Sequence, residues 1–204
     1  NRGACHLNGG YMVFLEVLGP LNVNPQTARS KPALTVLMQN MMEAISLSGV
    51  CLFTSMAMFP NAMHKLRPSG RLFRMLAKTT ERSGPVLGPV NRNPGMLKIN
   101  SRLVPYPLAL QYVTGVKMNL GTFLRAGEAG YNVERLFNIR EGLGTADDSL
   151  CQRMLESPQV PGQADTVVPL GEMLPEYYRS RGWDELGVPT KAKLSQLGIA
   201  DGSS

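Results

Sequence analysis

Cysteine and aromatic residues are scarce in this 204-residue chain, and both shortages exclude classes of protein. The three cysteines, Cys5, Cys51 and Cys151, are odd in number and widely separated. They exclude a self-contained disulfide framework and any Cys-x-x-Cys metal pair within the chain. We therefore expect a reducing compartment, the cytoplasm. Aromatic residues make up only 6% while methionine contributes 12 residues, so aliphatic and thioether side chains must fill most of the core.

The sequence also lacks an uninterrupted apolar run of membrane-spanning length. Its longest apolar stretch, residues 34–59, is broken by Gln39, Asn40 and Glu43, so we interpret it as buried core and expect no membrane partner. No initiator methionine and no signal peptide are visible at Asn1. This start predicts a fragment whose preceding residues are missing.

The net charge of +6 is unevenly distributed along the chain. Residues 60–105 contain nine basic side chains and one acidic side chain, together with many prolines and glycines. Apart from a short helix near residues 71–78, we expect this basic segment to be a loop excursion on the surface. A helical module that binds nucleic acid or an acidic protein through this segment remains an alternative, although the absence of nucleic-acid motifs does not favour it.

Helical spacing dominates outside the basic segment, and no alternating strand pattern competes with it. Ser30 and Pro32 predict the start of a helix that continues to Ile45, because a serine can cap a helix whose first turn contains proline. Pro107 predicts the start of a second helix. Its apolar stripe consists of Leu108, Tyr112, Val113 and Val116.

Glycine and capping residues predict the remaining helices. Helical stretches are expected over residues 120–126 and 131–140, separated at Gly127, and an Asp147-Asp148 pair can cap a short helix that runs through Leu155. A helix with Leu174, Tyr177 and Tyr178 ends before Gly182, and Thr190 caps a last helix that Gly198 terminates. The prediction is an all-α fold, an irregular multi-helix domain with long loops.

Few residues could carry chemistry when the sequence is considered alone. His6 beside Cys5 suggests a metal pair, but adjacent side chains diverge, and a hydrogen-bonded loop histidine is the commoner case. Cys51 lies in an apolar run, where an inert buried thiol is common, and Cys151 is interpreted as structural.

Several motifs in a fixed order add information. They resemble the C-terminal part of the tungsten-dependent aldehyde ferredoxin oxidoreductase family. The Arg-Gly-Ala-Cys-His segment at residues 2–6 is similar to the family's Arg-Gly-Ala-x-His, and Ser-Leu-Ser-Gly-Val-Cys at 46–51 is similar to Asp-x-x-Gly-Leu-Cys. The C-terminal matches are residues 109–115, 134–142, 147–148, 177–184, 187–190 and 194–198.

The resemblance implies a role for each matched residue. His6 would be the catalytic histidine beside the metal, able to relay a proton. Ser46, Gly49 and Val50 would contact a pterin, although the family has aspartate where this chain has Ser46. Cys51 would be a thiolate ligand of a [4Fe–4S] cluster. Tyr177, Tyr178 and Trp183 would be buried structural residues.

The resemblance also implies what the chain works with. Residues 1–204 would form the C-terminal helical domain of an enzyme that oxidises a small aldehyde to a carboxylic acid. Its cofactors would be a tungsten or molybdenum bis-pterin and a [4Fe–4S] cluster, both requiring residues outside this chain. Its partners would be ferredoxin or another electron-transfer protein and the missing N-terminal domains, so the chain alone should be inactive. A benzoyl-CoA reductase-type catalytic subunit of the same family is an alternative.

Overall fold

The computed structural model describes residues 7–10, 12–13, 15–16, 23–53, 70–101 and 104–200. Over these ranges the elements are helices, and in place of a sheet there are two isolated β-bridges, Val160–Gln163 and Trp183–Pro189. The predicted all-α fold is confirmed. Within the same ranges no helix has both the length and the apolar character needed to cross a membrane.

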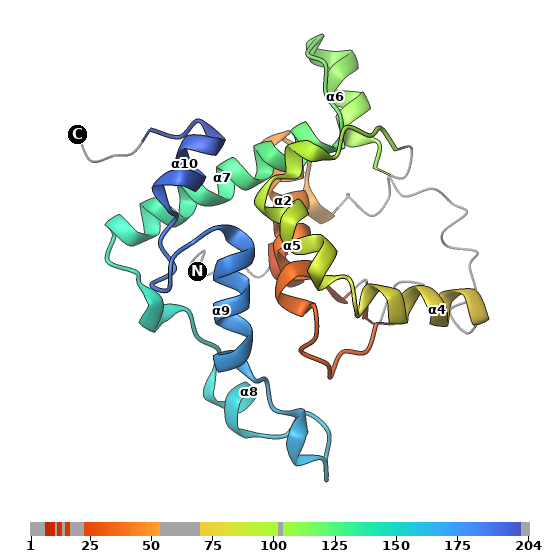
Figure 1. The fold of residues 1–204 in the computed structure, drawn as a ribbon, viewed down its shortest axis with the longest axis vertical. Coiled ribbons are helices and arrows are strands. Elements are labelled where there is room, and N and C mark those ends of the chain that lie inside the picture. The colour runs from red at the N-terminus through yellow and green to blue at the C-terminus, as the bar shows by residue number, and fades with distance from the viewer. Residues whose placement is uncertain are drawn as a thin grey trace.

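The central helix is α2, which contacts α1, α5, α7 and α9 (Figure 1). Helix α6 projects from the top of the fold, and α4 extends to the lower right in the same view. The α-helices are α1 (Leu7–Gly10), α2 (Lys31–Leu47), α4 (Arg71–Thr80), α5 (Gly84–Arg92), α6 (Tyr106–Thr114), α7 (Leu120–Arg140), α8 (Gln152–Glu156), α9 (Leu170–Arg181) and α10 (Lys191–Leu197). The short 3₁₀ helices are η3 (Pro94–Met96), η4 (Thr145–Asp147) and η5 (Ala164–Thr166).

Helix α2 begins where the sequence predicted and ends two residues later than Ile45, at Leu47. Ser30 precedes it, but the prediction that its side chain caps α2 is wrong. Its hydroxyl instead donates to the Glu81 carbonyl oxygen and accepts from the Gly84 N–H, both at 2.9 Å. These bonds attach the corner between α4 and α5 to the start of α2.

The basic segment is more helical than predicted, because α5 forms across Pro85, Gly88 and Pro89. Its last turn is attached to two neighbouring helices through the buried Asn91. The Asn91 side-chain amide donates to the Ala33 carbonyl of α2 at 2.8 Å and to the Ser180 hydroxyl of α9 at 3.1 Å. The expected loop excursion is therefore wrong for α5, which packs against α2 and α9.

Helix α7 is continuous, whereas the sequence predicted a break at Gly127. Glycine is required there for packing, because an added Cβ would lie 2.0 Å from the Asn40 carbonyl oxygen and 2.7 Å from the Ala44 nitrogen of α2. The close crossing of α2 and α7 thus depends on the absence of a side chain at residue 127.

Substituting Gly127→Ala is expected to destabilise the chain by about 2 kcal/mol. Overpacking against backbone typically costs about 1–3 kcal/mol, and the higher helix propensity of alanine returns up to about 1 kcal/mol. Urea denaturation of the purified chain measures the difference. Gly171→Ala in α9 is the matched control, because an added Cβ there meets no atom within 4 Å. Equal stabilities of the two variants would contradict the tight crossing.

Some of the predicted caps of the helices in the C-terminal half of the chain are confirmed, and others are wrong. Thr190 caps α10 by accepting from the Lys193 N–H at 3.2 Å, and Gly182 and Gly198 end α9 and α10 in the left-handed conformation, as predicted. The prediction that Asp147 and Asp148 cap the following helix is wrong, because α8 starts at Gln152 without a side-chain cap. Both aspartates bond elsewhere.

Candidate functional site

The candidate site lies at the C-terminal end of α2, in residues 46–53, which we call the Cys51 turn. Backbone hydrogen bonds close this turn: the Ser48 N–H donates to the Ala44 carbonyl at 3.1 Å, and the Gly49 N–H donates to the Ser46 carbonyl at 3.0 Å. Gly49 has a φ of +77°, a left-handed conformation that favours glycine. The sequence therefore determines where α2 stops and where the chain reverses.

Residues on either side of Cys51 attach the turn to the core. Val50 and Leu52 pack against a cluster that includes Ile45 and Phe123, while Cys51 itself is exposed. This arrangement contradicts the inert buried thiol that the apolar surroundings suggested. An accessible cysteine held on a packed turn is in a suitable place to act as a ligand or a reactive thiol.

The structure places four of the five predicted site residues together. Ser46 and Gly49 are exposed and Val50 is half-buried, all on the Cys51 turn. The fifth, His6, lies outside the described residues. Among the described residues no group of three or more His, Cys, Asp or Glu side chains could hold a metal ion. A metal cluster bound at Cys51 would therefore need further ligands from elsewhere.

A contact that the sequence did not suggest links the segment after His6 to the same helix. The Asn8 side-chain amide donates to the Glu43 carboxylate at 3.0 Å, and both residues are buried. Glu43 lies one turn of α2 before Leu47. Helix α2 thus holds both the residues that follow His6 and the Cys51 turn.

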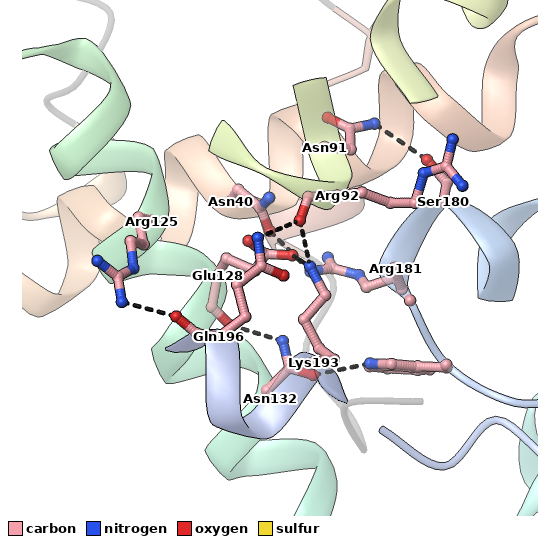
Figure 2. Close-up of polar contacts among 12 residues, drawn as sticks. Asn40, Asn91, Arg92, Arg125, Glu128, Asn132, Ser180, Arg181, Lys193 and Gln196 are labelled. Atoms are coloured by element: carbon pink, nitrogen blue, oxygen red, sulfur yellow. Dashed lines mark hydrogen bonds and ion pairs between the residues drawn. The ribbon is translucent and has the colours of Figure 1, made fainter. Parts of the chain in front are cut away.

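Arg181, on α9, lies at the centre of a second group of buried polar side chains, which attaches α9 to α2 (Figure 2). Its guanidinium donates to the Asn40 and Gln39 side-chain oxygens of α2, both at 2.7 Å, and stacks 3.7 Å from the centre of the Tyr131 ring. A buried cation is tolerated because acceptors and an aromatic face surround it. This group holds α2 in position, and we assign it a structural role.

A buried ion pair attaches α10 to α7 in the same region (Figure 2). The Lys193 ammonium lies 2.8 Å from a Glu128 carboxylate oxygen and donates to the Arg92 carbonyl at 2.7 Å. Burial raises the pKa of the Glu128 carboxyl, and the positive charge of Lys193 opposes that shift. The pair joins α10 both to α7 and to the end of α5.

The C-terminal motif residues form a third buried contact group. Arg135 donates to both Asp148 carboxylate oxygens, at 3.0 and 2.8 Å, and to the Gly187 carbonyl at 2.9 Å. The Tyr178 hydroxyl also donates to Asp148; burial and that carboxylate raise the pKa of Tyr178, so the hydroxyl keeps its proton. Tyr177, Tyr178 and Trp183 are buried, as predicted.

Substituting Arg135→Met is expected to destabilise the chain by about 3–5 kcal/mol, because it leaves the Asp148 carboxylate buried without its cation. Adding Asp148→Leu should recover part of this loss, since no uncompensated charge then remains. Denaturant titration measures all the variants. Arg140→Met, at the exposed end of α7, is the control and should change stability by less than about 1 kcal/mol. A small effect of Arg135→Met would contradict the structural role of the pair.

These features define an all-α domain whose central helix is followed, four residues after its last residue, by an exposed cysteine. The family described as aldehyde ferredoxin oxidoreductase, domains 2 and 3, matches residues 1–199. The chain belongs to this family, as the motifs predicted.

The relatives of this chain include proteins named tungsten-containing aldehyde ferredoxin oxidoreductase. The protein from Pyrococcus furiosus is 32% identical over 205 residues, and the one from Thermococcus kodakarensis is 30% identical over 205 residues. Each alignment covers 98% of this chain and 27% of the relative. The chain thus spans about a quarter of the length of these relatives.

Proposed function

We propose that this chain is the C-terminal helical domain of a pterin-dependent oxidoreductase that contains tungsten or molybdenum. The enzyme oxidises a small aldehyde to a carboxylic acid and passes the electrons through a [4Fe–4S] cluster to ferredoxin in the cytoplasm. The observation that carries the proposal is the exposed Cys51 on a closed turn at the end of α2, in a chain of this family.

Cys51 supplies one thiolate to the cluster. Sulfur is the ligand that iron–sulfur clusters require, and four ligands complete a [4Fe–4S] centre. The turn fits this role because backbone hydrogen bonds close its first residues and because Val50 and Leu52, on either side of Cys51, pack against the core. When bound, the cluster would accept and donate one electron at a time. The other three ligands come from polypeptide outside the described residues.

Ser46, Gly49 and Val50 contact the pterin from the same turn. The exposed Ser46 hydroxyl accepts hydrogen bonds from pterin N–H groups, although an uncharged hydroxyl is a weaker acceptor than a carboxylate. Gly49 has no side chain, so its backbone can approach a planar ring closely.

His6 acts as the proton-transferring residue of aldehyde oxidation. Conversion of an aldehyde to an acid adds an oxygen from water and releases protons, and an imidazole is suited to move them near neutral pH. The Asn8–Glu43 hydrogen bond attaches Asn8, two residues after His6 in the sequence, to α2.

Two alternatives to aldehyde oxidation remain from the sequence. A benzoyl-CoA reductase-type catalytic subunit would use the same chain in the reductive direction. A binding module would use the basic segment, and exposed Arg71, Arg74 and Lys78 on α4 are compatible with it. Affinity of the chain for DNA that falls steeply with salt would support the binding module.

The isolated chain is expected to fold without its cofactors and without activity. Circular dichroism should show a helical protein, while iron and tungsten contents should be far below stoichiometric and aldehyde-dependent dye reduction should be absent. The reason is that, of the three cysteines, Cys51 alone matches a ligand position of the family, and one thiolate cannot hold the cluster. The same measurements on the longer enzyme should give iron, metal and turnover. Stoichiometric iron in the isolated chain would contradict the assignment of external ligands.

A further inference from the structure

Helix α6 leads to an apolar tip that no described part of the chain covers. Tyr112 and Val113 are 83% and 85% exposed, and Val116 is 59% exposed. The sequence predicted that these residues form an apolar stripe, and the helix that leads to them, α6, projects from the fold (Figure 1). We call residues 112–116 the α6 tip. Contiguous exposed apolar side chains of this kind mark interaction surfaces.

The base of α6 is firmly attached. The Tyr106 ring stacks on Phe123 of α7 with their centres 6.0 Å apart, and Pro107 is buried. The segment that follows the tip is also attached to α6, since the Met118 N–H donates to the Gln111 side-chain oxygen at 3.2 Å. Because these contacts already attach α6 to the rest of the chain, docking of the tip needs little further ordering of the helix.

The α6 tip stands at the same end of the molecule as the Cys51 turn. Leu110 of α6 packs into the cluster that also holds Val50 and Leu52, the neighbours of Cys51. Leu47 and Phe53, on the turn, are 58% and 74% exposed. Exposed apolar side chains therefore lie on the Cys51 turn itself and at the tip of the helix whose Leu110 packs on the same cluster.

We propose that the α6 tip docks onto the part of the longer enzyme that supplies the remaining cluster ligands. This inference rests on the proposed function. A [4Fe–4S] cluster at Cys51 needs three further ligands, and these must approach the end of α2 beside which α6 projects. The Pyrococcus furiosus relative extends well beyond the quarter of its length that this chain matches, so such a part exists in the family.

The lack of charge at the α6 tip favours an apolar partner surface in a permanent contact. Residues 112–116 contain no charged side chain, and Lys117 is the adjacent charge. The cores of permanent interfaces are depleted in charge and enriched in aromatic residues, whereas transient electron-transfer partners use more polar, smaller contacts. The tip is therefore an interdomain contact and not the ferredoxin site.

Cysteine labelling of the purified holoenzyme tests the docking. Val113→Cys places a thiol at the tip, and Val86→Cys is the matched control. Val86 is 69% exposed on α5, which is attached to the opposite end of α2 through Ser30 and Gly84. Maleimide modification is followed by mass spectrometry of the peptides that contain positions 113 and 86. Iron, sulfide and tungsten contents are measured on the same preparation.

We expect the thiol at position 113 to react at least about 100-fold more slowly than the thiol at 86, as for a site reached only by local opening. The protection should not change on dilution. Equal rates would overturn the docking proposal. Protection that disappears on dilution, with 113–113 disulfide dimers on oxidation, would assign the tip to a second copy and also overturn it. A holoenzyme without an iron–sulfur cluster would contradict the proposed function, whatever the labelling rates are.

Discussion

Replacing Cys51 with alanine is expected to remove the [4Fe–4S] cluster from the longer enzyme and to reduce ferredoxin reduction to background. Alanine offers no ligand atom, and a cluster with three thiolates and an open iron is prone to loss. Visible absorbance, iron and sulfide analysis, and aldehyde-dependent reduction of ferredoxin measure the effect.

The exposed position of Cys51 makes this substitution a clean test. Truncating an exposed side chain usually changes stability by less than about 0.5 kcal/mol, so loss of the cluster would not reflect unfolding of α2. Cys151→Ala is the matched control, because Cys151 is also exposed but precedes α8, far from the Cys51 turn in sequence. The control should keep its cluster. Full iron and sulfide content in Cys51→Ala would remove Cys51 from the ligand set.

Replacing His6 with asparagine is expected to lower turnover by about 10²–10⁴-fold while the metal, pterin and cluster contents stay unchanged. This is the usual contribution of a positioned acid–base group. Asparagine keeps a hydrogen-bonding side chain of similar reach but cannot transfer a proton near neutral pH. Turnover must therefore be divided by the tungsten or molybdenum content of each preparation.

A histidine that only fastens its loop would give a different result. In that case His6→Asn would lower stability or cofactor content, and the rate per bound metal would not change. His64→Asn is the control, since His64 is the only other histidine of the chain and lies in the basic segment, where none of the family motifs quoted above falls. An unchanged normalised rate for His6→Asn would exclude His6 from the mechanism.

Local sequence signals were sufficient where the structure depends on neighbouring residues. The start of α2 at Lys31, with Pro32 in its first turn, the cap at Thr190 and the stops at Gly182 and Gly198 all follow from backbone preferences of a few residues. Motif spacing likewise placed Ser46, Gly49, Val50 and Cys51 together, because six consecutive residues cannot separate.

Predictions failed where a distant segment changed the local preference. The sequence predicted a helix break at Gly127, yet α7 is continuous through this residue. The glycine is present because α2 approaches α7 too closely for a side chain at this position. The proline- and glycine-rich segment of α5 was predicted to be a loop, yet it is helical, and Asn91 attaches it to α2 and α9. Asp148 was predicted to cap a helix, yet its carboxylate accepts hydrogen bonds from Arg135, 13 residues away in sequence.

The sequence by itself determined the helical class, the family and the identity of the candidate ligand, because periodicity, caps and motif order are properties of the chain. Only the tertiary structure decided exposure. It turned Cys51 outward between two core-packed neighbours, and it left Tyr112 and Val113 in solvent, although helical spacing places both on one apolar stripe. Burial depends on which helices meet, and that follows from packing of the whole fold, such as the crossing of α2 and α7 at Gly127.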